Sequence, residues 1–219
     1  MKSLPILACL GLAAGLALPV ATARAGTARN EIYAGVGTTG GTLGYGYAFG
    51  DHTAVRIEGN FLNFSHSFSA GSSDYKGSLR FRTLGLYYDF FPLGPLRLTG
   101  GVLVGSNKFE GSEAVSNGTL TINGQSYAAS GQWVRSTIDF NSTSPYLGIG
   151  WGHHPGFGPG FFTDLGFLYG RPTARITVSP GLQQAAGSAN LAAEQASLQR
   201  QADHLRFYPV LRMGVDFHW

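Results

Sequence analysis

The chain contains 219 residues, of which 33 are glycine and 13% are aromatic. Only 12% of the residues are charged, about half the share usual in a soluble domain, which argues against a typical soluble enzyme. The formal net charge is +3 and the Lys and Arg residues form no cluster in the sequence, so nucleic acid is not expected as a partner.

The N-terminal segment, residues 1–25, is predicted to be a signal peptide that is cleaved after export through the Sec pathway. Lys2 precedes an almost uninterrupted apolar run from Leu4 to Val20, and Ala23-Arg24-Ala25 has the small-x-small form that a signal peptidase reads. Prolines and glycines interrupt the run, so a membrane-anchor helix is the less favoured alternative. We expect residues 26–219 to form one outer-membrane β-barrel domain.

The only cysteine of the chain, Cys9, lies inside this leader. A lipoprotein site at Cys9 is a weak match, because the apolar run continues beyond it. The mature chain is therefore expected to have no disulfide and no thiol chemistry.

Period-two alternation begins near Asn30 and predicts membrane-spanning strands, which show alternate side chains to lipid and to the barrel interior. The last strand has the clearest pattern, with Leu211, Met213 and Val215 on one face and Arg212, Gly214 and Asp216 on the other. The eight expected strands span residues 31–38, 42–50, 53–63, 78–91, 96–105, 145–152, 160–170 and 205–219.

The connections between these strands alternate in length. Those at 50–52, 92–95 and 153–159 are short, whereas those after the third, fifth and seventh strands are long, as expected for periplasmic turns and extracellular loops. The predicted fold is all-β, an eight-stranded antiparallel up-and-down transmembrane β-barrel with both termini in the periplasm. A soluble lipocalin-like barrel would reverse the alternation and is the less favoured reading.

The two longest connections, residues 106–144 and 171–204, are candidate surfaces for an extracellular ligand, although plain solvent-exposed loops are the favoured interpretation. Asn123-Gly124 lies between alternating residues and predicts a hairpin over 119–127, which would also allow ten strands. Leucines seven residues apart predict a short helix over 190–204 in the last outer loop, packed on the barrel rim.

Aromatic side chains on the lipid-facing parity mark one membrane interface. They all lie at the short-turn ends of their strands, where amphipathic rings are expected to form a girdle. The predicted girdle consists of Phe49, Phe90, Trp151, Phe161 and Trp219.

Charged side chains of both signs share the inward parity, four of each. Balanced charges in a low-dielectric lumen are typical of a plug of ion pairs, and the alternative is a narrow path for solutes. These candidate lumen-lining residues are Arg56, Glu58, Asp89, Arg97, Asp164, Arg206, Arg212 and Asp216.

No catalytic, cofactor or metal site is predicted. A lipid-active enzyme would need a serine activated by a histidine, and His66 beside Ser65 and Ser67 is an unsuitable arrangement because neighbours in an extended chain point apart. The tandem His153-His154 has no further ligand at a supporting spacing.

The stretch Phe90-Phe91-Pro92-Leu93-Gly94-Pro95-Leu96-Arg97-Leu98-Thr99-Gly100-Gly101 resembles the strand-turn-strand segment of proteobacterial small outer-membrane β-barrel proteins related to the OmpW and opacity-protein group. Residues 190–194 and 207–211 resemble the closing helix and strand of that family. The C-terminal Phe217-His218-Trp219 resembles the signal that such barrels present to the barrel-assembly machinery, with Trp219 where Phe is most frequent.

This resemblance and the alternation together predict an integral protein of the Gram-negative outer membrane, in contact with membrane lipids and lipopolysaccharide. The expected role is structural or surface interaction without catalysis. The alternatives are a narrow channel for small or apolar solutes and a lipid-modifying enzyme.

Overall fold

The computed structural model describes residues 28–219. The predicted signal peptide and Cys9 lie outside the described residues. The barrel strands are β1 (Asn30–Gly37), β2 (Gly40–Gly50), β3 (Thr53–Ala70), β4 (Ser73–Leu93), β5 (Leu96–Val115), β9 (Thr143–Trp151), β10 (Gly158–Tyr169) and β12 (Phe207–His218).

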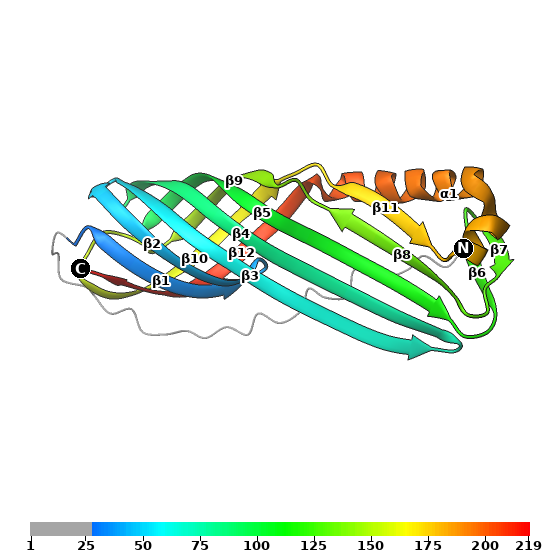
Figure 1. Cartoon of the computed structure of the whole chain (residues 1–219). Coiled ribbons are helices and arrows are strands. Elements are labelled where there is room, and N and C mark those ends of the chain that lie inside the picture. Colours follow the sequence, from blue (N-terminus) through cyan, green and yellow to red (C-terminus); the bar gives the residue numbers. More distant parts are fainter. Residues whose placement is uncertain (1–27) are drawn as a thin grey trace.

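These eight strands form a closed antiparallel ring, which confirms the predicted fold class (Figure 1). Strands β1 to β5 follow one another, β5 also pairs with β9, and β9 and β10 lead to β12. The ring closes where β1 pairs with β12, with Ala34 opposite Val215 and Glu31 opposite His218. A closed ring leaves no unpaired strand edge, as a hydrocarbon environment requires.

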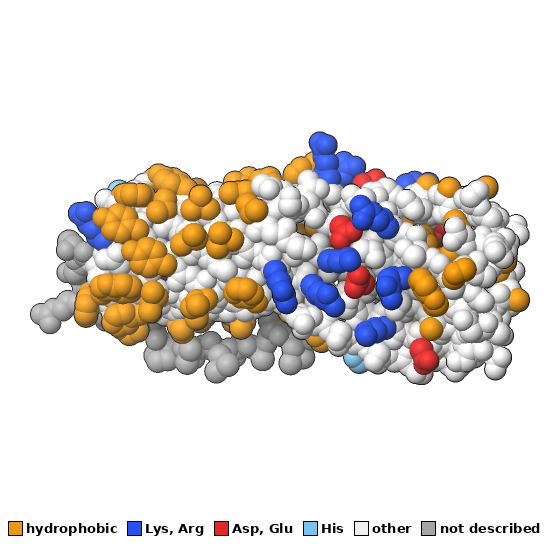
Figure 2. All heavy atoms as spheres, viewed as in Figure 1, with side chains coloured by type: hydrophobic (Ala, Val, Ile, Leu, Met, Phe, Trp, Pro, Cys, Tyr) orange, Lys and Arg blue, Asp and Glu red, His pale blue; other side chains and the backbone are white. Residues whose placement is uncertain are grey.

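The outward face of the ring is apolar around one half of the elongated molecule (Figure 2). Leu43, Leu84, Leu147 and Leu165 are 56–65% exposed, although each alternates with buried or half-buried neighbours. Such exposure of large aliphatic side chains is unfavourable in water and favourable in lipid. None of the helices between residues 28 and 219 is long and apolar enough to cross a membrane.

Strands β3, β4 and β5 continue well beyond the apolar belt, so three predicted boundaries are wrong. The long loop expected after the third strand is instead a tight turn at Gly71 and Ser72, where Gly71 has a φ of 63°. The predicted boundaries rested on the apolar outward residues. These residues end at the membrane surface, whereas the backbone pairing of the strands continues beyond it.

Two further strands, β8 (Gln132–Asp139) and β11 (Thr173–Val178), extend the protruding sheet, with β5 paired to β8 and β8 to β11. The hairpin of β6 (Thr119–Ile122) and β7 (Gln125–Ala128) forms its own sheet, so it adds no strand to the ring. Asn123 (φ 49°) and Gly124 (φ 75°) form its turn with the positive φ values that the Asn-Gly pair predicted.

The helix α1 (Pro180–Ala202) begins ten residues earlier than predicted, and a short 3-10 turn, η1 (Asp203–Arg206), follows it. The leucine spacing revealed only the part after Gly187, whose φ of 75° interrupts the helical geometry. The helix packs mainly on β11 and on the β6–β7 hairpin, which belong to the protruding part of the molecule, so the expectation that it packs on the barrel rim is wrong (Figure 1).

This protruding part, which we call the extension, has its own core. The buried members come from β5, β6, β11 and α1 and the loop before β8, and they are Val115, Leu120, Ile122, Ala129, Val178, Leu182 and Ala186. Because apolar burial is the main stabilising term in folding, the extension is an ordered unit and not a set of free loops.

We expect Leu182→Ala to loosen the extension while the barrel stays folded. Leu182 is fully buried in this core, and truncating such a side chain typically costs about 2–5 kcal/mol. Limited proteolysis of the refolded protein checks this, with cleavage expected in the extension only. Gln184→Ala, on the exposed face of the same helix, is the matched control. Equal protease resistance of both variants would contradict the prediction.

Candidate functional site: the filled barrel interior

Seven of the eight predicted lumen-lining residues are buried inside the barrel. Arg56, Asp89, Arg97 and Arg212 are at most 2% exposed, and Glu58, Asp164 and Asp216 at most 5%. Their strands place them at neighbouring levels, because Arg97 faces Gly150 across β5 and β9, and Asp164 lies opposite both Gly150 and Arg212.

The eighth residue, Arg206, lies at the outer mouth of the barrel and is not buried in its interior. It belongs to η1, and its half-exposed guanidinium contacts Asp203 at 3.3 Å. The prediction is wrong because the last strand begins at Phe207 and not at Leu205, so the parity of the strand does not apply to Arg206.

Six of the buried charges form a closed ring in which the signs alternate. We call it the charge ring, and its members in order are Arg56, Asp89, Arg97, Asp164, Arg212 and Glu58.

Every member of the charge ring contacts two groups of opposite sign. Three links are direct hydrogen-bonded ion pairs, Arg56 to Asp89, Arg97 to Asp164 and Arg212 to Glu58. The other three are longer, at 3.4 Å from Arg97 to Asp89, 3.2 Å from Arg212 to Asp164 and 4.0 Å from Arg56 to Glu58. Equal numbers of opposite charges make the ring neutral as a whole, which buried ions require.

Neutral polar groups add further hydrogen bonds to the ring. Glu58 accepts from Tyr33 at 3.0 Å, from Tyr87 at 2.6 Å and from the Asn60 amide at 2.9 Å. Thr99 donates to Asp89 at 2.6 Å. The Glu58 carboxylate is therefore held from several strands at once, and its position is fixed.

Inward-facing glycines provide the space for these large side chains. A Cβ atom at Gly85 would lie 2.5 Å from the Tyr87 ring, and one at Gly150 would collide with Asp164. The many glycines of the sequence are thus partly explained by the size of the residues that face them.

An apolar layer lies on the outer side of the charge ring. Leu103, Tyr146, Leu168 and Val210 form a buried cluster with Tyr87. Farther out, Phe81 on β4 and Tyr208 on β12 meet across the barrel, with ring centroids 5.2 Å apart. The interior is therefore filled on the extension side as well as at the charge ring.

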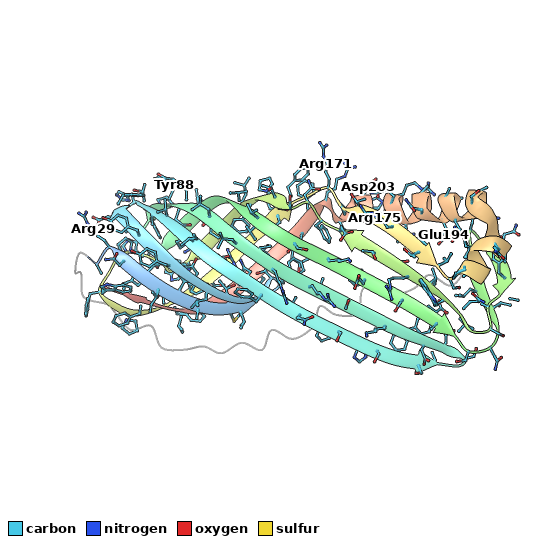
Figure 3. All side chains as sticks on the ribbon, in the orientation of Figure 1. Arg29, Tyr88, Arg171, Arg175, Glu194 and Asp203 are labelled. Atoms are coloured by element: carbon cyan, nitrogen blue, oxygen red, sulfur yellow. The ribbon has the colours of Figure 1, made fainter. Side chains whose placement is uncertain are left out.

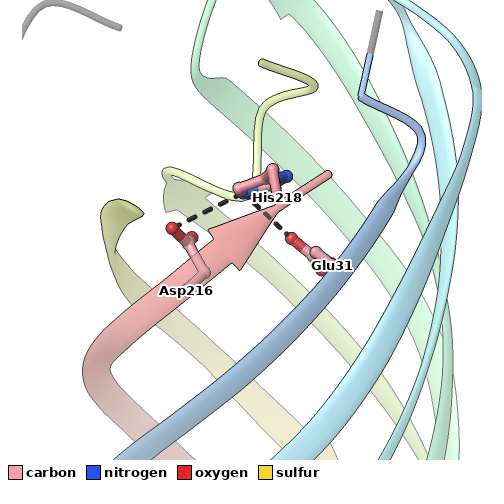
Figure 4. A group of neighbouring side chains, drawn as sticks. All are labelled: Glu31, Asp216 and His218. Carbon is pink, nitrogen blue, oxygen red and sulfur yellow. Dashed lines mark ion pairs between the residues drawn. The ribbon is translucent and has the colours of Figure 1, made fainter. Parts of the chain in front are cut away.

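A second cluster of charged and titratable groups lies at the opposite end of the lumen, near the C-terminus (Figure 4). Glu31 on β1 faces His218 on β12, and Asp216 lies two residues before His218 on the same inward face. His153, from the turn after β9, contacts Glu31 at 3.0 Å and Asp216 at 3.6 Å. We call these four residues the mouth cluster.

Sequence reasoning placed Asp216 on the inward face but did not join Glu31, His153 and His218 to it. The pairing register of β1 with β12 would have joined Glu31 to His218, because the two residues are cross-strand partners where the first and last strands meet. His153 could not be found from strand parity, since it lies in a turn that enters the barrel mouth.

The predicted aromatic girdle lies on the outward face at this same end of the barrel. Phe49, Phe90, Trp151, Phe161 and Trp219 are 44–57% exposed. Phe217 of the proposed assembly signal is also exposed, and its ring lies 6.5 Å from that of Trp219.

The outward face beyond the apolar belt carries a basic patch, which we call the collar. Figure 2 shows Lys and Arg side chains gathered on the part of the extension next to the apolar half. Strand register assigns this outward face six basic residues and three acidic ones. The basic residues are Lys76, Arg80, Arg82, Lys108, Arg135 and Arg175, and the acidic ones are Asp74, Glu110 and Asp139.

The collar keeps an excess of positive charge after its internal pairs are counted. Lys108 donates to Glu110 at 2.8 Å and thereby lowers the pKa of that carboxyl group, so Glu110 stays ionised. Arg175 contacts Asp139 at 3.8 Å with most of its side chain exposed, and Figure 3 shows it on β11, outside the barrel half. Arg80 and Arg82 have no such ion pair among the described residues.

The hydrogen bonds of residues 28–219 include none between a serine hydroxyl and a histidine ring. His66 lies on the exposed part of β3 near Phe68, with ring centroids 6.4 Å apart. The described residues therefore present no serine–histidine arrangement of the kind that hydrolysis requires.

A closed ring of eight antiparallel strands with an apolar outer belt and a polar interior has the fold of an outer-membrane β-barrel. No protein-family model and no curated protein sequence matches the chain.

Among solved structures, the chain is similar to CarO2 of Acinetobacter baumannii (TM-score 0.63, 21% identity, 88% of this chain and 99% of that chain covered). It is similarly close to CarO of the same organism (TM-score 0.62, 21% identity, 88% and 98% covered). These neighbours are outer-membrane β-barrels, and they support the fold.

We expect Arg97→Leu to destabilise the barrel strongly, because it leaves the buried Asp89 and Asp164 each without one cationic partner. Breaking a buried ion pair from one side typically costs about 3–5 kcal/mol. Urea unfolding of the protein refolded into phospholipid vesicles gives the free energy of unfolding. Arg206→Leu, which removes an exposed arginine, should change it by less than about 1 kcal/mol. Similar losses in the two variants would show that the charge ring does not stabilise the barrel.

Proposed function

We propose that this protein is a non-conducting barrel of the bacterial outer membrane that holds an ordered extension outside the cell for surface interaction. The observation that carries the proposal is the neutral, fully buried charge ring, which occupies the lumen. The extension, with its own core and helix, is the part of the molecule left to contact other molecules.

The closed interior supports this role over that of a channel. An ion entering the lumen would have to separate charges that already satisfy one another in a low-dielectric environment. It would also have to pass the apolar layer around Tyr146 and the contact between Phe81 and Tyr208. Eight strands enclose a space just wide enough for side chains, so little room remains beside them.

The distribution of outward side chains supports the orientation. The aromatic girdle and the C-terminal Phe217 and Trp219 lie at the end with short turns, which in such barrels faces the periplasm and the assembly machinery. The extension then projects from the outer surface, with the β3–β4 turn and α1 farthest from the girdle (Figure 1).

The collar lies at the height where lipopolysaccharide phosphates are expected. Arg82 and Arg80 precede Phe90 by eight and ten residues along β4, which corresponds to about 20 and 25 Å of barrel height at ~3.3 Å per residue and a tilt of ~40°. The apolar band of such barrels is about 25 Å tall. Arg82 also pairs with the exposed Phe61, the aromatic residue at the outer end of the belt on β3. We therefore infer that the collar binds the phosphates of lipid A.

Single-channel recording of the refolded mature protein in planar bilayers tests the closed lumen. We expect no discrete conductance steps from the wild type. The double variant Arg97→Ala/Asp164→Ala removes one charge of each sign and opens space, so small steps are expected from it. Arg206→Ala is the control outside the lumen. Regular steps from wild-type protein would overturn the proposal in favour of a narrow channel.

The collar is tested by binding to vesicles that contain lipid A with or without its phosphates. We expect Arg80→Gln/Arg82→Gln to weaken binding to phosphorylated lipid A about tenfold or more, because each charge-assisted hydrogen bond contributes about 1.5–3 kcal/mol. Arg29→Gln, which removes an exposed arginine at the opposite end of the molecule (Figure 3), should bind like the wild type. Equal affinity for both lipid forms would argue against a phosphate site.

A further inference from the structure

The mouth cluster brings together ligand atoms of the kind that hold a divalent metal ion. Glu31, Asp216 and His218 are all buried, and one atom of each lies within 4.8 Å of the others. His218 Nε2 is 3.4 Å from Glu31 Oε2 and 3.4 Å from Asp216 Oδ1 (Figure 4). A tetrahedral Zn²⁺ ion with bonds of about 2.0–2.2 Å separates its ligand atoms by about 3.3–3.6 Å. Both distances from His218 Nε2 match that requirement, and the two carboxylate oxygens lie within 4.8 Å of each other.

No arginine or lysine lies within ion-pair distance of Glu31 or Asp216 among the described residues. The charge ring is neutral by itself, and the cationic groups that lie within ion-pair distance of Glu31 and Asp216 among the described residues are His153 and His218 only. Two buried carboxyl groups therefore face two histidines, and burying the ionised form of a carboxyl group is favourable only where a cation compensates it.

His153 is neutral in this arrangement, as its neighbours show. Its Nε2 lies 3.4 Å from Nη1 of Arg56, a guanidinium that can only donate, so Nε2 must accept. The proton is then on Nδ1, which donates to Glu31 Oε2 at 3.0 Å.

Both carboxylates are held in place from the turn that carries His153. The ring of His153 fixes Glu31, and its backbone N–H donates to Asp216 Oδ2 at 3.2 Å. The other oxygen, Asp216 Oδ1, is buried and makes no hydrogen bond with the described residues, although it points toward His218 Nε2. His153 is thus a positioning residue, and an unpartnered carboxylate oxygen is directed at the centre of the cluster.

We propose that Glu31, Asp216 and His218 bind one divalent transition-metal ion, with Zn²⁺ the best match to a nitrogen and two carboxylate ligands. The fourth coordination position is left for water. Because Glu31 is on the first strand and the other two ligands are on the last, the ion would join β1 to β12 where the barrel closes. Its role is to stabilise this seam, and the inference does not depend on whether the lumen conducts.

Isothermal titration of the refolded, chelator-treated protein with Zn²⁺ tests the site. We expect the wild type to bind one equivalent and Glu31→Gln and His218→Gln each to bind at least tenfold more weakly. His66→Gln, which alters an exposed histidine on β3, should bind like the wild type. Absence of stoichiometric binding by the wild type, or unchanged affinity in both ligand variants, overturns the proposal.

The position and the geometry of the ion are measured on the unmodified protein, so the test does not require the variants to refold. Co²⁺ in place of Zn²⁺ should give the visible absorption of a tetrahedral site with mixed nitrogen and oxygen ligands. Anomalous X-ray scattering from wild-type crystals soaked in Zn²⁺ should show the ion between His218 Nε2 and Asp216 Oδ1. An ion bound only at another place, such as His52 or His204, contradicts the assignment.

Discussion

The alternating charge ring is the constraint on which the rest of the barrel depends. Three arginines and three carboxylates from five strands neutralise one another where water is excluded. Each is costly to bury alone, so removing any one leaves its two neighbours with a single partner each and destabilises them. The inward tyrosines and the glycines opposite them follow from this, because the ring needs donors such as Tyr87 and space such as that at Gly85.

The two faces of the sheet use charge in different ways, and the membrane explains the difference. Inward arginines such as Arg97 are paired and fully buried, whereas outward arginines such as Arg82 begin only where the apolar belt ends. An arginine on the lipid face at mid-depth costs about 2–4 kcal/mol, and that cost falls near the interface. The height of the collar is thus set by the same physics that requires pairing inside.

Strand number, ring closure and facing direction could be predicted from the sequence, because alternation has a period of two wherever one face meets lipid and the other a packed interior. The prediction failed where the lipid ended. Beyond Asn63, β3 keeps its backbone pairing with β4, but residues such as Ser65 and Ser67 no longer show which face is outward. The wrong placement of Arg206 in the lumen has a related cause. Arg206 belongs to a 3-10 turn, where side chains do not alternate with the period of two that holds in a strand.

The sites depend on contacts that a single strand does not encode. Parity identified six members of the charge ring, but their cyclic order arises from the closure of the barrel, which brings Arg212 on β12 to Glu58 on β3. The mouth cluster needs the same closure, because Glu31 and His218 meet only when the first strand pairs with the last. Ring and cluster therefore form only when the seam is complete. A metal ion at that seam would stabilise the closed barrel over any form in which β1 and β12 are apart, since only the closed form assembles its ligands.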